Sequence, residues 1–145
     1  MPDKISYFGT GEDAGDFSFL SNFYWFDDTT VEHQYQAAKT FDSEWKVQIL
    51  GASTPAEAKK LGRRCPIRED WEDVKISVMF DLLKEKFASG SLLAEKLLAT
   101  GDAILEEGNW WGDKYWGTVL GEGQNWLGNL LMMIRGELRK EQNQR

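Results

Sequence analysis

The sequence has one cysteine, Cys65, and one histidine, His33, among 145 residues. A single cysteine excludes an intramolecular disulfide and a metal site built from several thiolates. A single histidine excludes a site built from several imidazoles, and no loop has the acidic-residue spacing of a magnesium or calcium site. The composition therefore predicts no metal and no cofactor. A chain without disulfides is typical of the cytosol, which is the predicted compartment.

Long apolar runs, repeats and low-complexity tracts are also missing from the sequence. No stretch approaches the length of a membrane span, and the first residues lack the apolar segment of a signal peptide. No membrane partner is therefore expected. A chain of this length without an internal linker predicts one domain over residues 1–145, with a frayed tail after about residue 139.

Positive charge is scarce, and the formal net charge is −7. Such a charge balance argues against nonspecific binding to the phosphate backbone of nucleic acids, because that binding needs clustered Lys and Arg side chains. The one dense basic cluster comprises Lys59, Lys60, Arg63 and Arg64, at the end of an expected helix. Two interpretations have equal support: cations placed at a helix C-terminus, or a phosphate clamp, since arginine offers two parallel donors.

Helix signals dominate what the sequence does contain. Capping residues and apolar spacing predict helices after Thr30, over 43–51, 55–61, 71–88 and 91–98, and over 126–138. Strand signals are few: a strand over residues 5–8, a hairpin of 23–26 with 29–31 around the Asp27-Asp28 turn, and one short strand near Ile104. Loops are expected over residues 9–16 and through the Gly-rich stretch 102–124. The expected fold class is mainly α, an α+β arrangement with a small N-terminal strand pair.

The helix after Thr30 carries the most informative pattern. Glu32, Tyr35, Gln36 and Lys39 are spaced at i, i+3, i+4 and i+7 and share one face of that helix. The helix follows residues 17–26, the most aromatic segment of the chain. A polar, titratable face beside aromatic side chains is typical of a small-molecule site.

Each residue of this helix also has a structural interpretation. Glu32 in the first turn could simply satisfy the helix dipole, which favours the ionised carboxylate. If Glu32 is functional, its simplest role is to stabilise a developing positive charge with its ionised carboxylate. Lys39 could be a solvated lysine, an electrostatic partner or a nucleophile. His33 faces away from Glu32, which favours a hydrogen-bonded structural role.

A Trp-rich loop raises a second hypothesis. Asp113 lies among Trp110, Trp111 and Trp116 in an irregular stretch. Low polarity around a carboxyl group perturbs its pKa, which suits proton chemistry. The glycines that follow, Gly121-x-Gly123-x-Asn125-x-x-Gly128, do not have the spacing of a dinucleotide-binding motif, although they could bring backbone N–H groups close to a ligand.

Taken in order, these motifs resemble the NADAR family, also called YbiA-like. The resemblance is carried by Phe19-Leu20-Ser21-Asn22-Phe23, Glu32-His33-x-Tyr35-Gln36-Ala37-x-Lys39, Ala58-Lys59-x-Leu61-Gly62-Arg63, Thr100-Gly101-Asp102, Trp116-Gly117, Gly121-x-Gly123-x-Asn125-x-Leu127-Gly128 and Met132 to Arg135. It extends from Ile5 to Leu138. Each motif alone is weak, whereas the ordered set is specific.

The resemblance implies a mainly helical domain with little sheet and an N-glycosidase activity. Some members of the family hydrolyse the ribosylamine bond of early, phosphorylated riboflavin-pathway intermediates, and others remove ADP-ribose from guanine bases. Cleavage of a C1′–N bond by water, without a metal, is therefore implied. The resemblance also implies which residues are functional in this chain. They are Glu32 and Lys39, together with Asn22, Trp71, Asp113 and Trp116. The insertion-like stretch 107–112 leaves the alignment of Asp113 open.

The sequence therefore predicts an N-glycosidase acting on a small phosphorylated ribosyl-base substrate. Glu32, Lys39 and Asp113 are the catalytic candidates, and the substrate-binding candidates are Asn22, Tyr35, Arg63, Arg64, Trp71 and Trp116. The alternatives are a hydrolase of ADP-ribosylated guanine in nucleic acid, and a non-catalytic module that binds a nucleotide or ADP-ribose.

Overall fold

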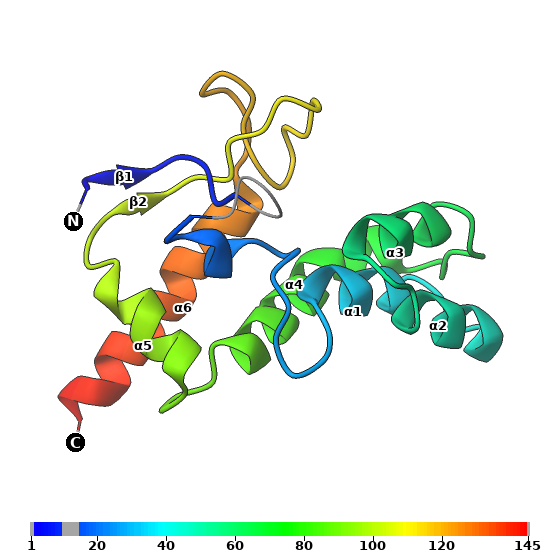
Figure 1. Cartoon of the computed structure of the whole chain (residues 1–145), viewed down its shortest axis with the longest axis horizontal. Coiled ribbons are helices and arrows are strands. Elements are labelled where there is room, and N and C mark those ends of the chain that lie inside the picture. Colours follow the sequence, from blue (N-terminus) through cyan, green and yellow to red (C-terminus); the bar gives the residue numbers. More distant parts are fainter. Residues whose placement is uncertain (1, 10–14, 145) are drawn as a thin grey trace. The chain divides into compact units, whose positions relative to one another are not determined.

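The computed structural model describes residues 2–9 and 15–144 (Figure 1). The chain divides into two units. Unit 1 comprises Met1–Ser21 and Leu83–Arg145, and unit 2 comprises Asn22–Leu82. The expected loop over residues 9–16 lies for the most part outside the described residues. None of the helices in the described part of the chain is both long and apolar enough to cross a membrane.

Three short helices form most of unit 2, followed by the first turns of a longer one. They are α1 (Val31–Ala38), α2 (Ser43–Leu50), α3 (Pro55–Gly62) and α4 (Trp71–Lys86). Helix α1 packs against α2 and α3 around a small apolar core (Figure 1). Polar side chains cap the N-termini of α1, α2 and α3, and the cap of α2 is Asp42, one residue before the Ser43 that begins the helix. These local caps explain why the predicted helix starts lie within a residue of the observed ones.

The single histidine is a structural part of unit 2. The Thr30 hydroxyl accepts from the His33 backbone N–H at 3.0 Å and lies 2.7 Å from the ring Nδ1. On the other side of the ring, Nε2 lies 2.9 Å from the Ala52 carbonyl oxygen, which can only accept. His33 therefore carries its proton on Nε2 and joins the start of α1 to the end of α2, as expected for a buried structural histidine.

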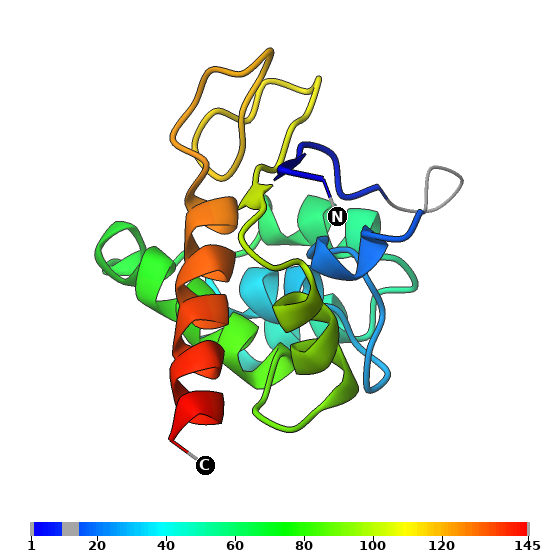
Figure 2. The same ribbon diagram turned by 90° about the vertical axis from the view of Figure 1, so that its left-hand side faces the viewer.

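Unit 1 contains the sheet and two packed helices. Strand β1 (Lys4–Ile5) pairs in parallel with β2 (Ile104–Leu105), with Lys4 opposite Ile104. A 3₁₀ helix, η2, covers Ser18–Leu20, and α5 (Leu92–Ala99) packs against α6 (Trp126–Asn143), as both views show (Figures 1 and 2). The fold class is the mainly helical one that the sequence predicts, with a two-stranded sheet.

Two details differ from the sequence expectation. Asp27 and Asp28 form the expected tight turn, both with positive φ, but only Phe26 and Thr29 pair across it. Pairing stops there because the chain enters α1 two residues later. Helix α6 continues to Asn143, beyond residue 139, after which the sequence predicts a frayed tail. Arg139 anchors it by donating to the Gly101 carbonyl at 2.7 Å and to the Asp102 carboxylate at 3.1 Å.

Lys86 is a buried lysine at the end of α4. Only 2% of it is exposed, and its ammonium group donates to the Ser21 carbonyl at 2.9 Å. The same nitrogen lies 5.1 Å from the centroid of the Phe87 ring. Burial lowers the pKa of Lys86 to about 7, because an apolar environment disfavours the charged form.

This burial predicts a stability that rises with pH. Between the folded pKa of about 7 and an unfolded pKa of ~10.4, the unfolded chain binds a proton that the folded chain does not. The free energy of unfolding therefore increases across this window. The Lys86→Met variant has no titrating group at this position. As pH rises through this window, the free energy of unfolding of the wild type should therefore increase relative to that of the variant, by up to ~1.4 kcal/mol per pH unit. Urea unfolding at a series of pH values measures it.

Lys84→Met is the matched control, because Lys84 lies on the same helix with a side chain that is 52% exposed. Its difference from wild type should stay constant with pH. Parallel pH profiles for wild type and Lys86→Met would contradict the prediction.

Candidate active site

Glu32 lies buried in the first turn of α1, with 8% of it exposed. Its Oε1 accepts a hydrogen bond from Gln36 Nε2 at 2.7 Å. Burial raises the pKa of the Glu32 carboxyl, and the hydrogen bond from Gln36 and the charges of Lys59 and Lys39 oppose this rise only in part. Desolvation therefore outweighs the interactions that favour the charged form, whereas the position of Glu32 in the first helical turn predicts an ionised carboxylate. The carboxylate is poised to exchange protons as well as to carry charge.

Gln36 owes its position to a glycine on the neighbouring helix. A Cβ atom at Gly62 in α3 would overlap the side-chain amide of Gln36. Gly62 therefore lets Gln36 lie between the two helices, where it holds Glu32. Helical spacing places Gln36 on the polar face but assigns it no role, and the signal in the sequence for that role is the glycine at position 62.

Lys39 ends α1 as its C-cap, one helical turn after Tyr35. Its Nζ lies 5.7 Å from the centroid of the Tyr35 ring. Burial lowers the pKa of Lys39, and the positive charges of Arg63 and Lys59 lower it further, while Glu32 raises it. Desolvation is a larger effect on this pKa than the opposite charge of Glu32. A neutral Lys39 amine is therefore more accessible than in a solvated lysine.

Aromatic and amide side chains complete the surroundings of Glu32 in unit 2. Tyr35 and Trp71 are both buried, and their ring centroids are 5.1 Å apart. The Asn22 carbonyl accepts from the Glu32 backbone N–H at 3.0 Å, and Asn22 Nδ2 lies 3.6 Å from Met79 Sδ. Among the described residues the buried Oδ1 of Asn22 has no hydrogen-bond partner. A buried acceptor without a partner is unusual, which makes Asn22 a candidate for contact with a ligand.

Two residues of the basic cluster are linked to Lys39. Arg63 is the C-cap of α3, and its charge and that of Lys59 lower the pKa of Lys39. Arg63 and Arg64 are both exposed, so exposure does not distinguish them. The electrostatic effect on the half-buried Lys39 therefore favours Arg63, with Lys59, as the cation of this site.

Asp113 and Trp116 belong to unit 1. The Asp113 Oδ1 accepts from the backbone N–H groups of Tyr115 and Trp116, at 3.0 and 2.9 Å. This is an Asx turn, which explains an aspartate in this loop without any catalytic role. The rings of Tyr115 and Trp116 pack edge to face, with centroids 5.0 Å apart. Catalysis by Asp113 stays a prediction from the family resemblance.

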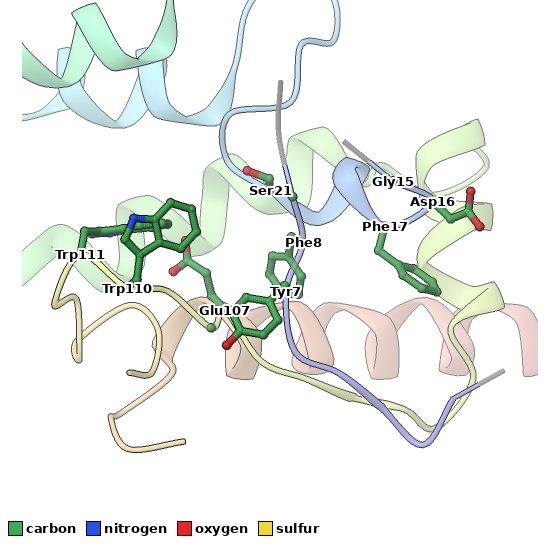
Figure 3. Close-up of a pocket in the computed structure, with 11 residues that line it drawn as sticks. Tyr7, Phe8, Gly15, Asp16, Phe17, Ser21, Glu107, Trp110 and Trp111 are labelled. Atoms are coloured by element: carbon green, nitrogen blue, oxygen red, sulfur yellow. The ribbon is translucent and has the colours of Figure 1, made fainter. Parts of the chain in front are cut away.

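Unit 1 also contains a cavity of about 310 Å³ (Figure 3). Aromatic side chains surround it, with Trp110 and Trp111 on one side and Phe17 on the other. Two acidic residues, Glu107 and Asp16, complete the lining. In the described residues, no three His, Cys, Asp or Glu side chains come together as a metal site requires.

The sequence matches the NADAR domain model over residues 9–139. This chain belongs to the NADAR family. The resemblance read from its motifs is thereby confirmed. The NMR structure of the Escherichia coli protein YbiA is similar over the whole chain and 90% of its own length, with a TM-score of 0.82 and 37% sequence identity. The fold expected from the family is confirmed as well.

Curated relatives include several named N-glycosidases. Escherichia coli N-glycosidase YbiA is 38% identical over 144 residues, which cover 92% of this chain and 88% of YbiA. An N-glycosidase of Nostoc punctiforme is 39% identical, over 83% of this chain and 78% of its own length. A riboflavin biosynthesis protein of Vibrio vulnificus is 37% identical over 97% of this chain, which spans only 40% of that relative.

Proposed function

We propose that this chain hydrolyses the C1′–N bond of a phosphorylated ribosylamine, such as an early intermediate of riboflavin biosynthesis. The N-glycosidase class follows from the NADAR family and from the names of the relatives. The substrate is suggested by the relative named for riboflavin biosynthesis. A cytosolic place of action is part of the same proposal. The observation that carries it is the buried Glu32 together with the half-buried Lys39 on the polar face of α1.

Glu32 is suited to stabilise the transition state. Cleavage of an N-glycosidic bond develops positive charge on C1′ and the ring oxygen. A carboxylate that is already in place and poorly hydrated stabilises such charge more strongly than it would in water. Glu32 meets these conditions, because it is buried and fixed by Gln36. The amide Oδ1 of Asn22 would accept a hydrogen bond from a ribose hydroxyl.

Lys39 has two possible roles, and the structure favours the covalent one. Its lowered pKa makes the neutral amine available for attack on C1′. In that step the bond from Nζ to C1′ forms as the bond from C1′ to the base nitrogen breaks, and a proton of the amine leaves with the base. The ring bond from C1′ to O4′ then breaks, O4′ takes the remaining amine proton, and an imine of the opened sugar results. Water then adds to the imine and releases ribose 5-phosphate and the free amine. In the electrostatic alternative, the ammonium group of Lys39 orients Glu32 and a sugar hydroxyl.

A paired assay tests the proposal against its alternatives. The protein is incubated with a ribosylaminouracil phosphate and, separately, with ADP-ribosylated DNA, and the released base or ADP-ribose is measured by mass spectrometry. We expect release from the ribosylaminouracil phosphate. Release from DNA alone would instead identify an ADP-ribosyl-guanine hydrolase. Binding without release would identify a non-catalytic module.

Arg63 is proposed to bind the phosphate group of the substrate. The Arg63→Ala variant should raise KM by about tenfold and leave kcat within about twofold, because a phosphate contact is equally strong in the ground and transition states. Steady-state kinetics measures both constants. Arg64→Ala is the matched control and should keep the wild-type KM. Equal effects of the two substitutions on KM would contradict phosphate binding by Arg63. The cluster would then be explained by the favourable placement of cations at a helix C-terminus.

A further inference from the structure

We propose that the cavity in unit 1 binds a planar nitrogen base, held against aromatic rings with its N–H groups facing Glu107. None of the residues assigned above to phosphate and sugar lines this cavity. Only the choice of an aminouracil as the probe rests on the proposed function.

Exposed aromatic side chains are the first evidence for a ligand. Tyr7, Trp110 and Trp111 are exposed by 63%, 78% and 52%, and all three line the cavity. Large apolar side chains gathered on one surface mark a binding site more often than single exposed ones do. The two indole rings pack edge to face, with centroids 5.0 Å apart, and so offer both an edge and a face to a flat ligand.

Hydrogen bonds to the backbone hold the loop that contains the two tryptophans. Buried Asn109 donates from Nδ2 to the Asp113 carbonyl at 2.8 Å, and its Oδ1 accepts from the Asp113 N–H at 3.0 Å. These two hydrogen bonds close the loop around Trp110 and Trp111. The indoles are therefore presented by a fixed backbone, which reduces the entropy lost on binding.

Glu107 is held in place from two sides. Its backbone N–H donates to Asn125 Oδ1 at 3.0 Å, and Asn125 Nδ2 donates to the Leu105 carbonyl at 2.9 Å. A Cβ atom at Gly117 would overlap the Glu107 carbonyl and approach its carboxylate. A Cβ atom at Gly128 would overlap the Leu105 carbonyl. The Gly-x-Gly-x-Asn-x-x-Gly motif thus supports the cavity wall instead of holding a dinucleotide.

Charge decides the chemistry of the ligand. The lining holds two carboxylates, Glu107 and Asp16, and no Lys or Arg side chain among the described residues. A phosphate or carboxylate ligand is therefore disfavoured. In Figure 3, Glu107 lies on the side of the tryptophans, whereas Asp16 lies at the opposite end. A carboxylate beside aromatic rings suits a base that presents amino or imide N–H groups in its plane.

The size of the cavity agrees with this ligand. A volume of about 310 Å³ lies at the lower end of small-molecule sites. It has room for one heterocycle, so an aminouracil fits better than a dinucleotide. Phe8 and Phe17 also line the cavity, Phe17 on the side away from the tryptophans, and they add apolar contact for a flat ring.

Nuclear magnetic resonance of the tryptophan indole N–H groups tests the proposal directly. Phenylalanine substitutions at Trp110 and Trp111 assign their signals, and the wild-type protein is titrated with 5,6-diaminouracil. We expect the Trp110 and Trp111 signals to shift, and Glu107→Gln to weaken binding about tenfold through the lost charged acceptor. Trp110→Ala should weaken it on the order of tenfold through lost stacking.

The controls separate this proposal from the proposed hydrolysis. Glu122→Gln and Trp25→Ala alter an exposed acid of unit 1 and an exposed indole of unit 2, and both should bind the base normally. Inorganic phosphate should leave the Trp110 and Trp111 signals unchanged. Unshifted signals in a protein that hydrolyses ribosylaminouracil phosphate would overturn the cavity proposal alone. Shifted signals that Glu107→Gln abolishes, in a protein without hydrolysis, would support the cavity and reject the proposed reaction.

Discussion

Replacing Glu32 by glutamine is expected to lower kcat by ~10²–10³ while the fold is retained. The substitution removes one negative charge and keeps the size of the side chain. Gln36 can still hydrogen-bond the new amide, so α1 keeps its internal contact. The lost rate reflects the positive charge that develops at C1′ and has no counterion in the variant. Single-turnover kinetics with ribosylaminouracil phosphate measures the effect, and circular dichroism checks the fold.

Glu44→Gln is the matched control for this variant. Glu44 occupies the second position of α2, as Glu32 does in α1, but it is exposed. Both substitutions therefore remove the same favourable interaction with a helix dipole, and only one removes a buried carboxylate. Glu44→Gln should turn over at the wild-type rate. Near-normal turnover by Glu32→Gln would exclude Glu32 from the mechanism.

The second large effect is expected at Lys39. Lys39→Arg should lose at least ~10² in kcat, because a guanidinium keeps the charge but cannot act as a nucleophile. Borohydride added during turnover should reduce the imine and leave a ribosyl phosphate adduct on Lys39. Peptide mass spectrometry locates that adduct. Lys46→Arg is the control, since Lys46 donates to the Ala37 carbonyl in the same unit and should not be modified.

The pH dependence distinguishes the two roles of Lys39. Burial raises the pKa of Glu32 and lowers that of Lys39. If Glu32 acts as the carboxylate, the rate falls as pH drops through its raised pKa. If Lys39 acts as the neutral amine, the rate rises with pH through the lowered pKa and then stays level. A bell-shaped profile, with no adduct and with activity retained in Lys39→Arg, would establish the electrostatic role instead.

Local signals in the sequence account for most of the helices. Thr30, Thr54 and Ser91 cap helices through hydrogen bonds to residues three positions away, so their effect is visible without any tertiary contact. The same holds for the Asp27-Asp28 turn. The sheet is different, because β1 pairs with a segment about one hundred residues later in the chain. No local pattern specifies that pairing, and the hairpin expected nearby reduces to one bridge.

The candidate site shows the same division between local and tertiary information. Helical spacing alone places Glu32 and Lys39 on one face, and the ordered motifs establish the NADAR family. The direction of both pKa shifts required the structure, because desolvation depends on what packs over a side chain rather than on its neighbours in sequence.

Tertiary packing also chose between residues that the sequence could not separate. Arg63 and Arg64 are adjacent and chemically identical, and it is the charge of Arg63, at the end of the α3 helix that packs against α1, that lowers the pKa of Lys39. Likewise, Arg139 extends α6 through contacts to a turn far away in sequence. The sequence by itself determined the family, the helices and the polar face. The tertiary structure decided the direction of the two pKa shifts and favoured Arg63 as the cation, because both depend on burial and distance between segments that sequence order does not reveal.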